Sequence, residues 1–212
     1  MHHHIVIEGP LGVGKTSLAN MLAANMNGQT LLENPEENPF LKKFYKNRNL
    51  YGFQTQIFFL LQRYQQITEI SQIGLFNKVI ISDYLFDKDR IFAKTNLDDD
   101  EFWLYDQLFQ LLRRRIMSPD LVIFLQAKTE ILIQRIKSRN REYEKSISYE
   151  YLDGINQAFN EFFFHYSDSP LLIINASDID FVHVPEDFND LVKQIRKIKS
   201  GTQYYNLMSS RD

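Results

Sequence analysis

A glycine-rich stretch close to the N-terminus has the residue types and spacing for phosphate chemistry. Residues 9–16 read G-x-x-x-x-G-K-T, with a β-branched run before them and a helical pattern of apolar residues after them. Between a strand and a helix, backbone N–H groups and the positive end of the helix dipole surround an anion. Lys15 would neutralise the β- and γ-phosphates, and the Thr16 hydroxyl would ligate Mg²⁺. The stretch therefore predicts a nucleoside triphosphate site, the alternative being a glycine turn that binds nothing.

The donor site is expected to include the glycine-rich stretch and the residue after it. The residues expected there are Gly9, Gly12, Val13, Gly14, Lys15, Thr16 and Ser17.

Two acidic residues are candidates to work beside the phosphate site. Asp83 closes an apolar run at residues 79–82, the usual setting of a carboxylate that holds Mg²⁺ directly or through water; a helix N-cap is its alternative role. Glu33 ends a short apolar run and could accept the proton of an attacking hydroxyl group. Its alternative is a solvated loop acid, and Glu36 and Glu37 lie close enough in sequence to be confused with it.

A long helix predicted from residue 51 to about 73 carries a polar pair on an apolar face. Gln56 and Arg63 are seven residues apart, so they share one face two turns apart. If they are buried they need partners, which the edge of a nucleobase would provide, and Asp89 could orient the guanidinium. The alternative is a Gln/Arg stripe that faces solvent.

Three arginines lie at or just past the end of another predicted helix. Arg135, Arg139 and Arg141 could clamp a triphosphate and stabilise charge during phosphoryl transfer. They could equally form a solvated basic helix end.

The pattern of elements predicts an α/β fold that would bring these residues together. Strands are expected at about 5–7, 30–33, 78–82, 121–125 and 171–174, with helices between them. This alternation indicates a five-stranded parallel sheet with helices on both faces. Ligands of such sheets bind beyond the carboxyl ends of the strands, where the glycine-rich stretch, Glu33 and Asp83 would meet. One domain is expected over residues 1–212, with a lid at about 135–146 and a flexible tail from about 200.

Composition narrows the class of protein. The 212 residues are 44% hydrophobic with a formal charge of −3, which argues against a general nucleic-acid binder. Cysteine is absent, so neither a disulfide framework nor a thiolate metal site is expected. No apolar run approaches the roughly 18 residues of a membrane span, and Met1 leads almost directly into the first strand without a signal peptide, so a soluble, cytoplasmic protein is expected.

With these residues in view, the chain resembles the deoxynucleoside kinase family, particularly its bacterial deoxyadenosine/deoxyguanosine kinases. The resemblance runs from residue 5 to about 198 and implies a P-loop kinase fold. The segments that carry it are 33–39 (ENPEENP), the Phe44-Tyr45 pair, the Gln56/Arg63 spacing, Asp89-Arg90 with Phe92-Ala93, and 135–144.

The resemblance implies roles for the acceptor side of the site. Glu33 matches the general base that deprotonates the nucleoside 5′-hydroxyl. Tyr45 and Glu144 match the pair that holds the sugar 3′-hydroxyl and disfavours a 2′-hydroxyl. The residues that match base contacts are Gln56, Arg63 and Asp89, with Phe92 stacking on the base.

The resemblance also implies roles on the donor side and an assembly. Arg135, Arg139 and Arg141 match lid arginines over the donor phosphates, and Asp180-Phe181 resembles, more loosely, the loop that receives the donor adenine. Similar proteins are homodimers built through long helices.

Two positions depart from the family pattern. Family members commonly have Arg after the acidic residue that ends strand three, whereas this chain has Tyr84 after Asp83. That Arg helps to position the 5′-hydroxyl and the phosphates, so Arg90, the lid arginines or Tyr84 itself would have to take its role. Asn140 stands between the lid arginines where glycine is usual.

The leading hypothesis is transfer of the γ-phosphate of MgATP to the 5′-hydroxyl of a purine deoxynucleoside (deoxyadenosine, deoxyguanosine or both) in nucleotide salvage. One alternative is a thymidylate-kinase-like nucleoside monophosphate kinase, whose acceptor needs an extra cation and less general-base help. Another is a regulatory protein that binds nucleotide without transferring phosphate. The purine preference follows from the resemblance alone, since a Gln/Arg/Asp set can satisfy cytosine, adenine or guanine, and the choice between ATP and GTP stays open.

Overall fold

The structure is a computed structural model that describes residues 2–73, 78–139, 141–177 and 179–205. The strands are β1 (His4–Glu8), β2 (Gln29–Leu31), β3 (Ile80–Ser82), β4 (Leu121–Gln126), β5 (Leu171–Asn175) and β6 (Thr202–Tyr205). The α-helices are α1 (Lys15–Met26), α2 (Leu41–Lys46), α3 (Arg48–Ile73), α4 (Lys88–Asn96), α5 (Asp99–Arg113), α6 (Thr129–Ser138), α7 (Tyr149–Phe164) and α8 (Pro185–Lys197). Short 3-10 helices span Pro35–Glu37 and Glu142–Glu144.

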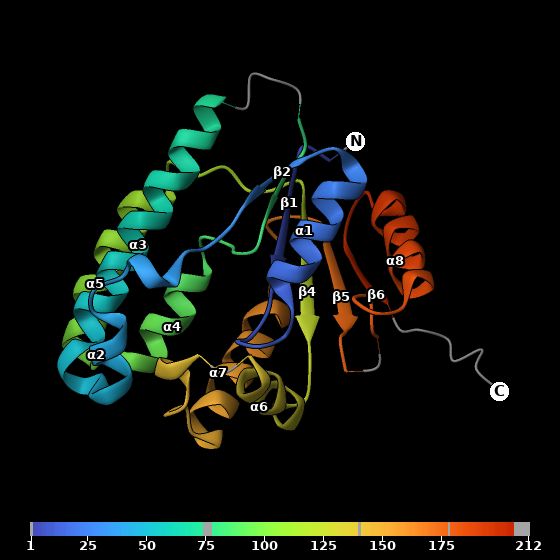
Figure 1. Cartoon of the computed structure of the whole chain (residues 1–212). Coiled ribbons are helices and arrows are strands. Elements are labelled where there is room, and N and C mark those ends of the chain that lie inside the picture. Colours follow the sequence, from blue (N-terminus) through green and yellow to red (C-terminus); the bar gives the residue numbers. More distant parts are fainter. Residues whose placement is uncertain (1, 74–77, 140, 178, 206–212) are drawn as a thin grey trace.

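A parallel sheet forms the centre of the chain (Figure 1). Its order is β2-β3-β1-β4-β5-β6, and every neighbouring pair is parallel. Because β1 lies between β3 and β4, the carboxyl end of β1 is at the point where the chain's connections diverge to either side, a usual place for a ligand. The predicted α/β class and the parallel sheet are confirmed.

The sheet has six strands, so the prediction of five was wrong. Residues 202–205 were expected in a flexible tail, but they pair with β5 in the register Leu171↔Thr202 to Ile174↔Tyr205. This edge strand depends on backbone hydrogen bonds more than on side-chain burial, since three of its four side chains are exposed. A strand with so little apolar character has no hydrophobic pattern to reveal it in the sequence. Residues 206–212 lie outside the described part of the chain.

Helices cover both faces of the sheet, as predicted, and alternate residues of each strand supply the two cores. In β4, Leu121, Ile123 and Leu125 face one core, which α1, α6 and α8 complete. Val122 and Phe124 face the other, against α4 and α7. Burial on both faces explains why the strands read as continuous apolar runs.

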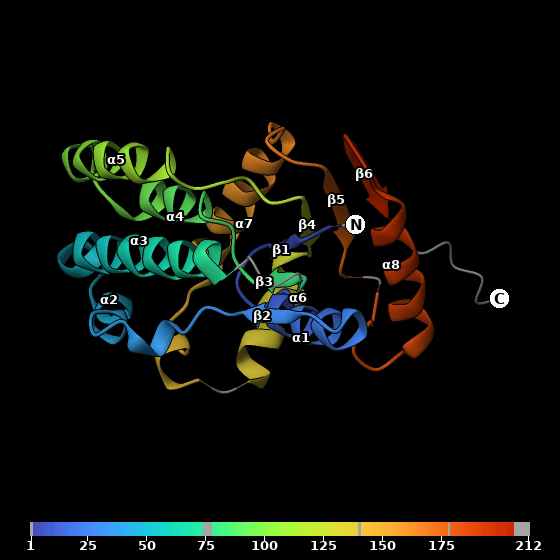
Figure 2. The same ribbon diagram turned by 90° about the horizontal axis from the view of Figure 1, so that it is seen from above.

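A second group of helices stands beside the sheet. Helices α3, α4 and α5 share a small core that includes Leu60, Phe86 and Phe109, and α2 packs against α3 (Figure 2). This arrangement places the inner side of α3 and α4 opposite the glycine-rich loop across the carboxyl ends of the strands (Figure 1). None of the described helices is long and apolar enough to span a bilayer. The single domain and the cytoplasmic location stay predictions.

Candidate active site

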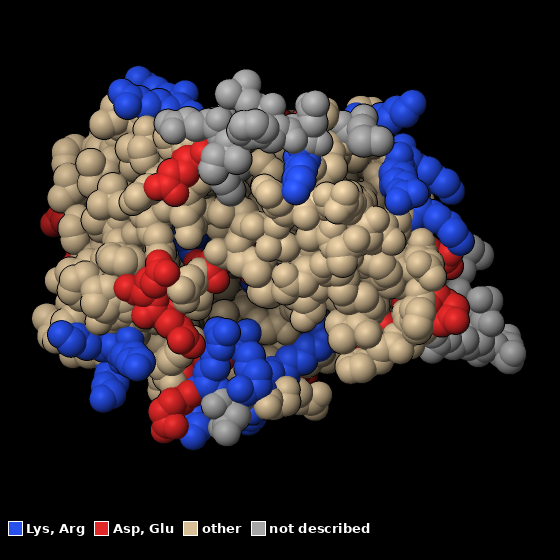
Figure 3. All heavy atoms as spheres, turned by 45° about the horizontal axis from the view of Figure 1, so that its top comes forward, with Lys and Arg blue, Asp and Glu red and all other residues tan. Residues whose placement is uncertain are grey.

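A deep cavity of about 710 Å³ opens beyond the carboxyl ends of β1 and β3. Its walls are the glycine-rich loop, α3, α4, the segment after α6, and residues 177 and 179–183. Figure 3 shows the surface hollowed between a group of acidic side chains and a group of basic ones. Among the site residues predicted from the sequence, Gly9 is the one that does not line this cavity. The volume suits a small-molecule site.

The glycine-rich loop has the backbone of a phosphate cradle. Gly9, Gly12 and Gly14 have φ angles of 151°, 85° and 108°, a region that side chains disfavour, and Gly14 directly precedes α1. At Gly9 a Cβ atom would lie 2.4 Å from the carbonyl oxygen of Leu125, so the close approach of loop and β4 requires glycine. Residues 15–17, in the first turn of α1, line the cavity, and the N–H groups at the start of a helix have no partners within that helix.

Lys15 is held over this loop. Its Nζ donates hydrogen bonds to the carbonyl oxygens of Gly9 (2.7 Å) and Pro10 (3.1 Å). Burial, and then repulsion from Lys88, lower the pKa of Lys15 to about 8. A group of negative charges at this position, such as a polyphosphate, would favour the ammonium form and raise that pKa.

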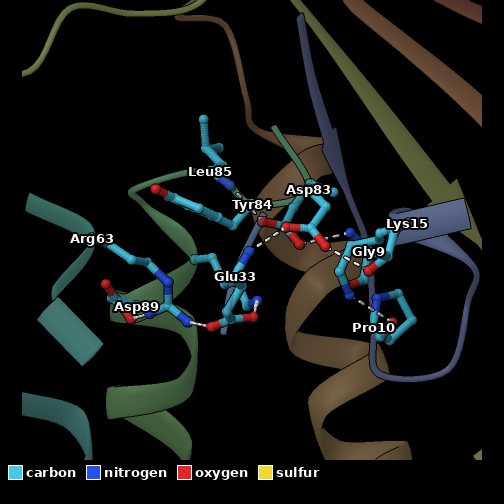
Figure 4. Close-up of polar contacts among 12 residues, drawn as sticks. Gly9, Pro10, Lys15, Glu33, Arg63, Asp83, Tyr84, Leu85 and Asp89 are labelled. Carbon is cyan, nitrogen blue, oxygen red and sulfur yellow. Dashed lines mark hydrogen bonds and ion pairs between the residues drawn. The ribbon is translucent and has the colours of Figure 1, made fainter. Parts of the chain in front are cut away.

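Asp83 connects the glycine-rich loop to Glu33. Its Oδ2 accepts a hydrogen bond from Thr16 Oγ1 at 2.5 Å, and its Oδ1 accepts one from the backbone N–H of Glu33 at 2.8 Å (Figure 4). The adjacent hydroxyl and carboxylate oxygens suit Mg²⁺, which takes one or two protein ligands and completes its shell with phosphate and water. The described residues contain no cluster of three or more His, Cys, Asp or Glu side chains that could hold a metal by themselves.

Glu33 lies between two cations. Its Oε1 accepts a hydrogen bond from Arg63, and its Oε2 accepts one from Lys88 at 2.7 Å. Burial by itself raises the pKa of Glu33, but the charges of Arg63 and Lys88 outweigh it and hold that pKa well below its usual range. The carboxylate is therefore ionised at neutral pH and able to accept a proton, although its low pKa makes it a weak base until a substrate alters the pairing.

The polar pair on α3 faces the cavity. Gln56 and Arg63 are both 3% exposed and line the wall, so the alternative of a solvent-facing stripe is excluded. Arg63 pairs with Asp89 of α4 as well as with Glu33 (Figure 4). Within the described residues, the buried atoms Arg63 Nε and Asp89 Oδ2 have no hydrogen-bond partner. Buried groups left in this way need a polar ligand, and Phe92 beside them offers a flat apolar surface.

The segment after α6 closes another side of the cavity. Arg139 forms two hydrogen bonds of 2.8 Å with the carboxylate of buried Glu144, and Arg141 approaches the same carboxylate at 3.7 Å. Tyr45 stacks on Tyr143 of this segment with ring centroids 5.9 Å apart. The tertiary structure thus joins two predicted lid arginines to a predicted sugar contact. Asn140 lies outside the described residues.

The remaining predicted donor contacts are near the glycine-rich loop. Arg135 donates to the carbonyl oxygens of Val13 (3.2 Å) and Ala176 (3.0 Å), so it braces the loop against the end of β5. Phe181 is buried beside Gly14, while Asp180 is largely exposed and pairs with His183.

Lys88 is the site residue that sequence reasoning missed. The sequence pattern that could have revealed Lys88 is its spacing on a short amphipathic helix. It lies four residues before Phe92 and directly before Asp89, both of which were predicted site residues. Two of the substitutes for the missing Arg have other partners. Tyr84 is buried and donates a hydrogen bond to Gln66 at 2.9 Å, and exposed Arg90 pairs with Asp106 at 2.6 Å.

Comparison with known proteins agrees with this geometry. The model of the family described as "Deoxynucleoside kinase" matches residues 5–200. A deoxyguanosine kinase of Bacillus subtilis is 31% identical over 92% of this chain and 96% of its own, and a deoxyadenosine kinase of Dictyostelium discoideum is 38% identical over 90% and 78%. The solved structure of deoxyadenosine kinase from M. mycoides with bound dATP superposes with a TM-score of 0.80 at 26% identity, covering 92% of this chain and all of that one. The cavity therefore belongs to an enzyme that binds nucleosides and nucleotides, and the chain is a member of the deoxynucleoside kinase family.

Proposed function

We propose that this enzyme transfers the γ-phosphate of MgATP to the 5′-hydroxyl of a purine deoxynucleoside. The observation that carries the proposal is the position of Glu33. Its backbone N–H donates a hydrogen bond to Asp83, beside the glycine-rich loop, and its carboxylate accepts one from Arg63 of α3. A carboxylate there lies where a hydroxyl from one wall would meet a phosphoryl group from the other. In-line transfer needs mainly this positioning together with neutralised charge.

The donor half would consist of the glycine-rich loop, Lys15, Thr16 and Asp83. Backbone N–H groups and Lys15 would neutralise the phosphates, while Thr16 and Asp83 would hold Mg²⁺. Arg139 and Arg141, at the cavity edge, would add charge over the transferred group.

The acceptor half would lie on α3, α4 and the segment after α6. Glu33 would accept the 5′-hydroxyl proton. Tyr45 and Glu144 would hold the 3′-hydroxyl, and Gln56, Arg63 and Asp89 would bond the base. The unpartnered Arg63 Nε and Asp89 Oδ2 support a base that presents both donors and acceptors.

The purine preference is supported by the relatives named above, which act on deoxyguanosine and deoxyadenosine. A third relative, of Bacillus subtilis, is a deoxyadenosine/deoxycytidine kinase, so cytosine belongs among the bases to be tested.

The pairing of cations argues against a monophosphate acceptor. Such a substrate brings a second phosphate that needs a free cation at the acceptor end, but Arg63 and Lys88 are both bound to carboxylates. Glu33 itself would repel that phosphate.

We also propose that the enzyme is a homodimer. Helix α5 exposes Trp103 (64%), Leu104 (47%), Leu108 (39%) and Leu111 (57%), and the adjacent α3 exposes Leu61 (54%). An apolar surface of this extent on packed helices favours a protein partner, and a second copy would bury the same face of each chain.

A substrate panel tests the proposed reaction. ADP release is measured with MgATP and each of the four deoxynucleosides or dTMP, and repeated with MgGTP. Turnover that depends on deoxyadenosine or deoxyguanosine is expected. Turnover with dTMP alone would favour the monophosphate kinase, and ATP binding without turnover would favour a regulatory protein.

A further inference from the structure

Lys88 is a buried cation in the wall of the cavity. It is the first residue of α4, is 5% exposed and lines the cavity wall. Its Nζ donates to Glu33 Oε2 at 2.7 Å and lies 5.8 Å from the ring centre of Phe92. The ammonium group thus lies between the carboxylate of Glu33 and the surface offered to a base.

The local structure of α4 gives no reason for a lysine there. A cation at the first position of a helix meets the positive end of its dipole, and burial removes its hydration. Carboxylates compensate for both costs: Glu33 contacts Lys88 directly, and the buried Glu8 interacts with its charge. The carboxylates around Lys88, and not its helix, therefore account for a lysine at this position.

Lys88 also acts on the donor side through its charge. Repulsion from Lys88 is the second cause, after burial, of the lowered pKa of Lys15, so the two ammonium groups are close enough for their charges to interact. Glu8 links the glycine-rich loop to the segment before α4. Its two carboxylate oxygens accept hydrogen bonds from the backbone N–H groups of Gly9 (2.9 Å) and Leu85 (2.7 Å).

Other nearby cations have different partners. Arg90 pairs with Asp106 outside the cavity, and Arg139 pairs with Glu144. Arg63 reaches the opposite oxygen of Glu33 but divides its guanidinium between Glu33 and Asp89. Among the described residues, Lys88 is thus the cation that contacts Oε2 of Glu33.

We propose that Lys88 is a positioning residue that fixes the Glu33 carboxylate between the glycine-rich loop and the acceptor hydroxyl. It holds Oε2 while Arg63 holds Oε1, so the carboxylate cannot rotate away when a base engages Arg63. The proposal rests on the proposed function, since it concerns the same reaction.

The test compares charge removal with charge retention at this position. Lys88→Met and Lys88→Gln are expected to lower kcat by about 10- to 100-fold, the effect of a small misplacement of a catalytic group, with KM for ATP changed less than about twofold. Lys88→Arg should recover most of kcat because it keeps a donor and a charge. Lys94→Met, at an exposed position of the same helix, is the matched control and should keep wild-type kinetics. Thermal melting checks that each variant is folded.

The outcomes separate this inference from the proposed reaction. A wild-type enzyme that phosphorylates none of the deoxynucleosides would overturn the proposed function. If the wild type is active and a folded Lys88→Met or Lys88→Gln variant keeps its kcat, the positioning role is wrong. It is also wrong if Lys88→Arg is folded but as inactive as the neutral variants. Should both neutral variants unfold, a folded Lys88→Arg with wild-type KM for ATP and at least a tenth of wild-type kcat supports the role, and a lower kcat overturns it.

Discussion

Asp83 links Thr16, at the start of α1, to the backbone of Glu33. The Thr16 hydroxyl, on the first turn of α1, donates to the Asp83 carboxylate at 2.5 Å, although 67 residues separate them. The other oxygen of Asp83 holds the backbone of Glu33. A movement of α1 would therefore reach Glu33 through one side chain.

Replacement of Glu33 tests the general base. Glu33→Gln should lower kcat by about 10²–10⁴-fold, because an amide cannot accept the hydroxyl proton. Steady-state kinetics give kcat, and ATP affinity is measured separately by calorimetry. Glu36→Gln, at an exposed position nearby, should behave as wild type. Near-normal turnover of Glu33→Gln would remove Glu33 from this role.

Replacement of Arg63 tests the base-binding wall. Arg63→Ala should raise KM for the deoxynucleoside and leave the Kd of ATP within about twofold, because the truncation leaves Asp89 buried without its cation but does not touch the glycine-rich loop. Arg90→Ala, an exposed arginine on α4, is the control. A loss of ATP affinity in Arg63→Ala would instead assign this wall to the donor.

The stability of the fold should depend on His4 below neutral pH. Burial lowers the pKa of His4 from 6.5 to about 4, against the opposing charge of Asp120, and its ring lies 3.0 Å from Ser82 Oγ. Between these two pKa values the unfolded chain binds a proton that the folded chain does not, so stability falls as pH decreases from about 6.5 to 4. The loss attributable to this ring is at most ~3 kcal/mol.

Urea unfolding at pH 7.5 and pH 5 measures this dependence. His4→Gln should show a smaller loss of unfolding free energy between the two values than the wild type, and the exposed His165→Gln should match the wild type. Equal losses in the wild type and His4→Gln would show that the ring does not titrate with folding.

The apolar surface of α5 should determine the oligomeric state. Leu104→Lys places a charge in this surface and is expected to shift a dimer toward monomer in light scattering after size exclusion, while Phe164→Lys, on the exposed side of α7, should not. An unchanged mass for Leu104→Lys, or a monomeric wild type, would contradict the proposed homodimer.

Local patterns in the sequence were enough for much of the site. The glycine-rich loop needs only neighbouring residues, so its motif predicts its backbone. Helix periodicity placed Gln56 and Arg63 on one face, because two turns of α3 separate them whatever surrounds the helix. Burial on both faces produced the apolar runs from which strands such as β4 and β5 were predicted.

Tertiary structure decided the features that depend on contacts between distant segments. The strand β6 is held by backbone bonds to β5, which leave no apolar pattern in residues 202–205. Lys88 meets Glu33, 55 residues away in the sequence, only in the folded chain, and Tyr84 donates a hydrogen bond to Gln66 instead. Side-chain chemistry was readable from the chain, but which charge lies beside which depends on packing geometry that no local pattern encodes.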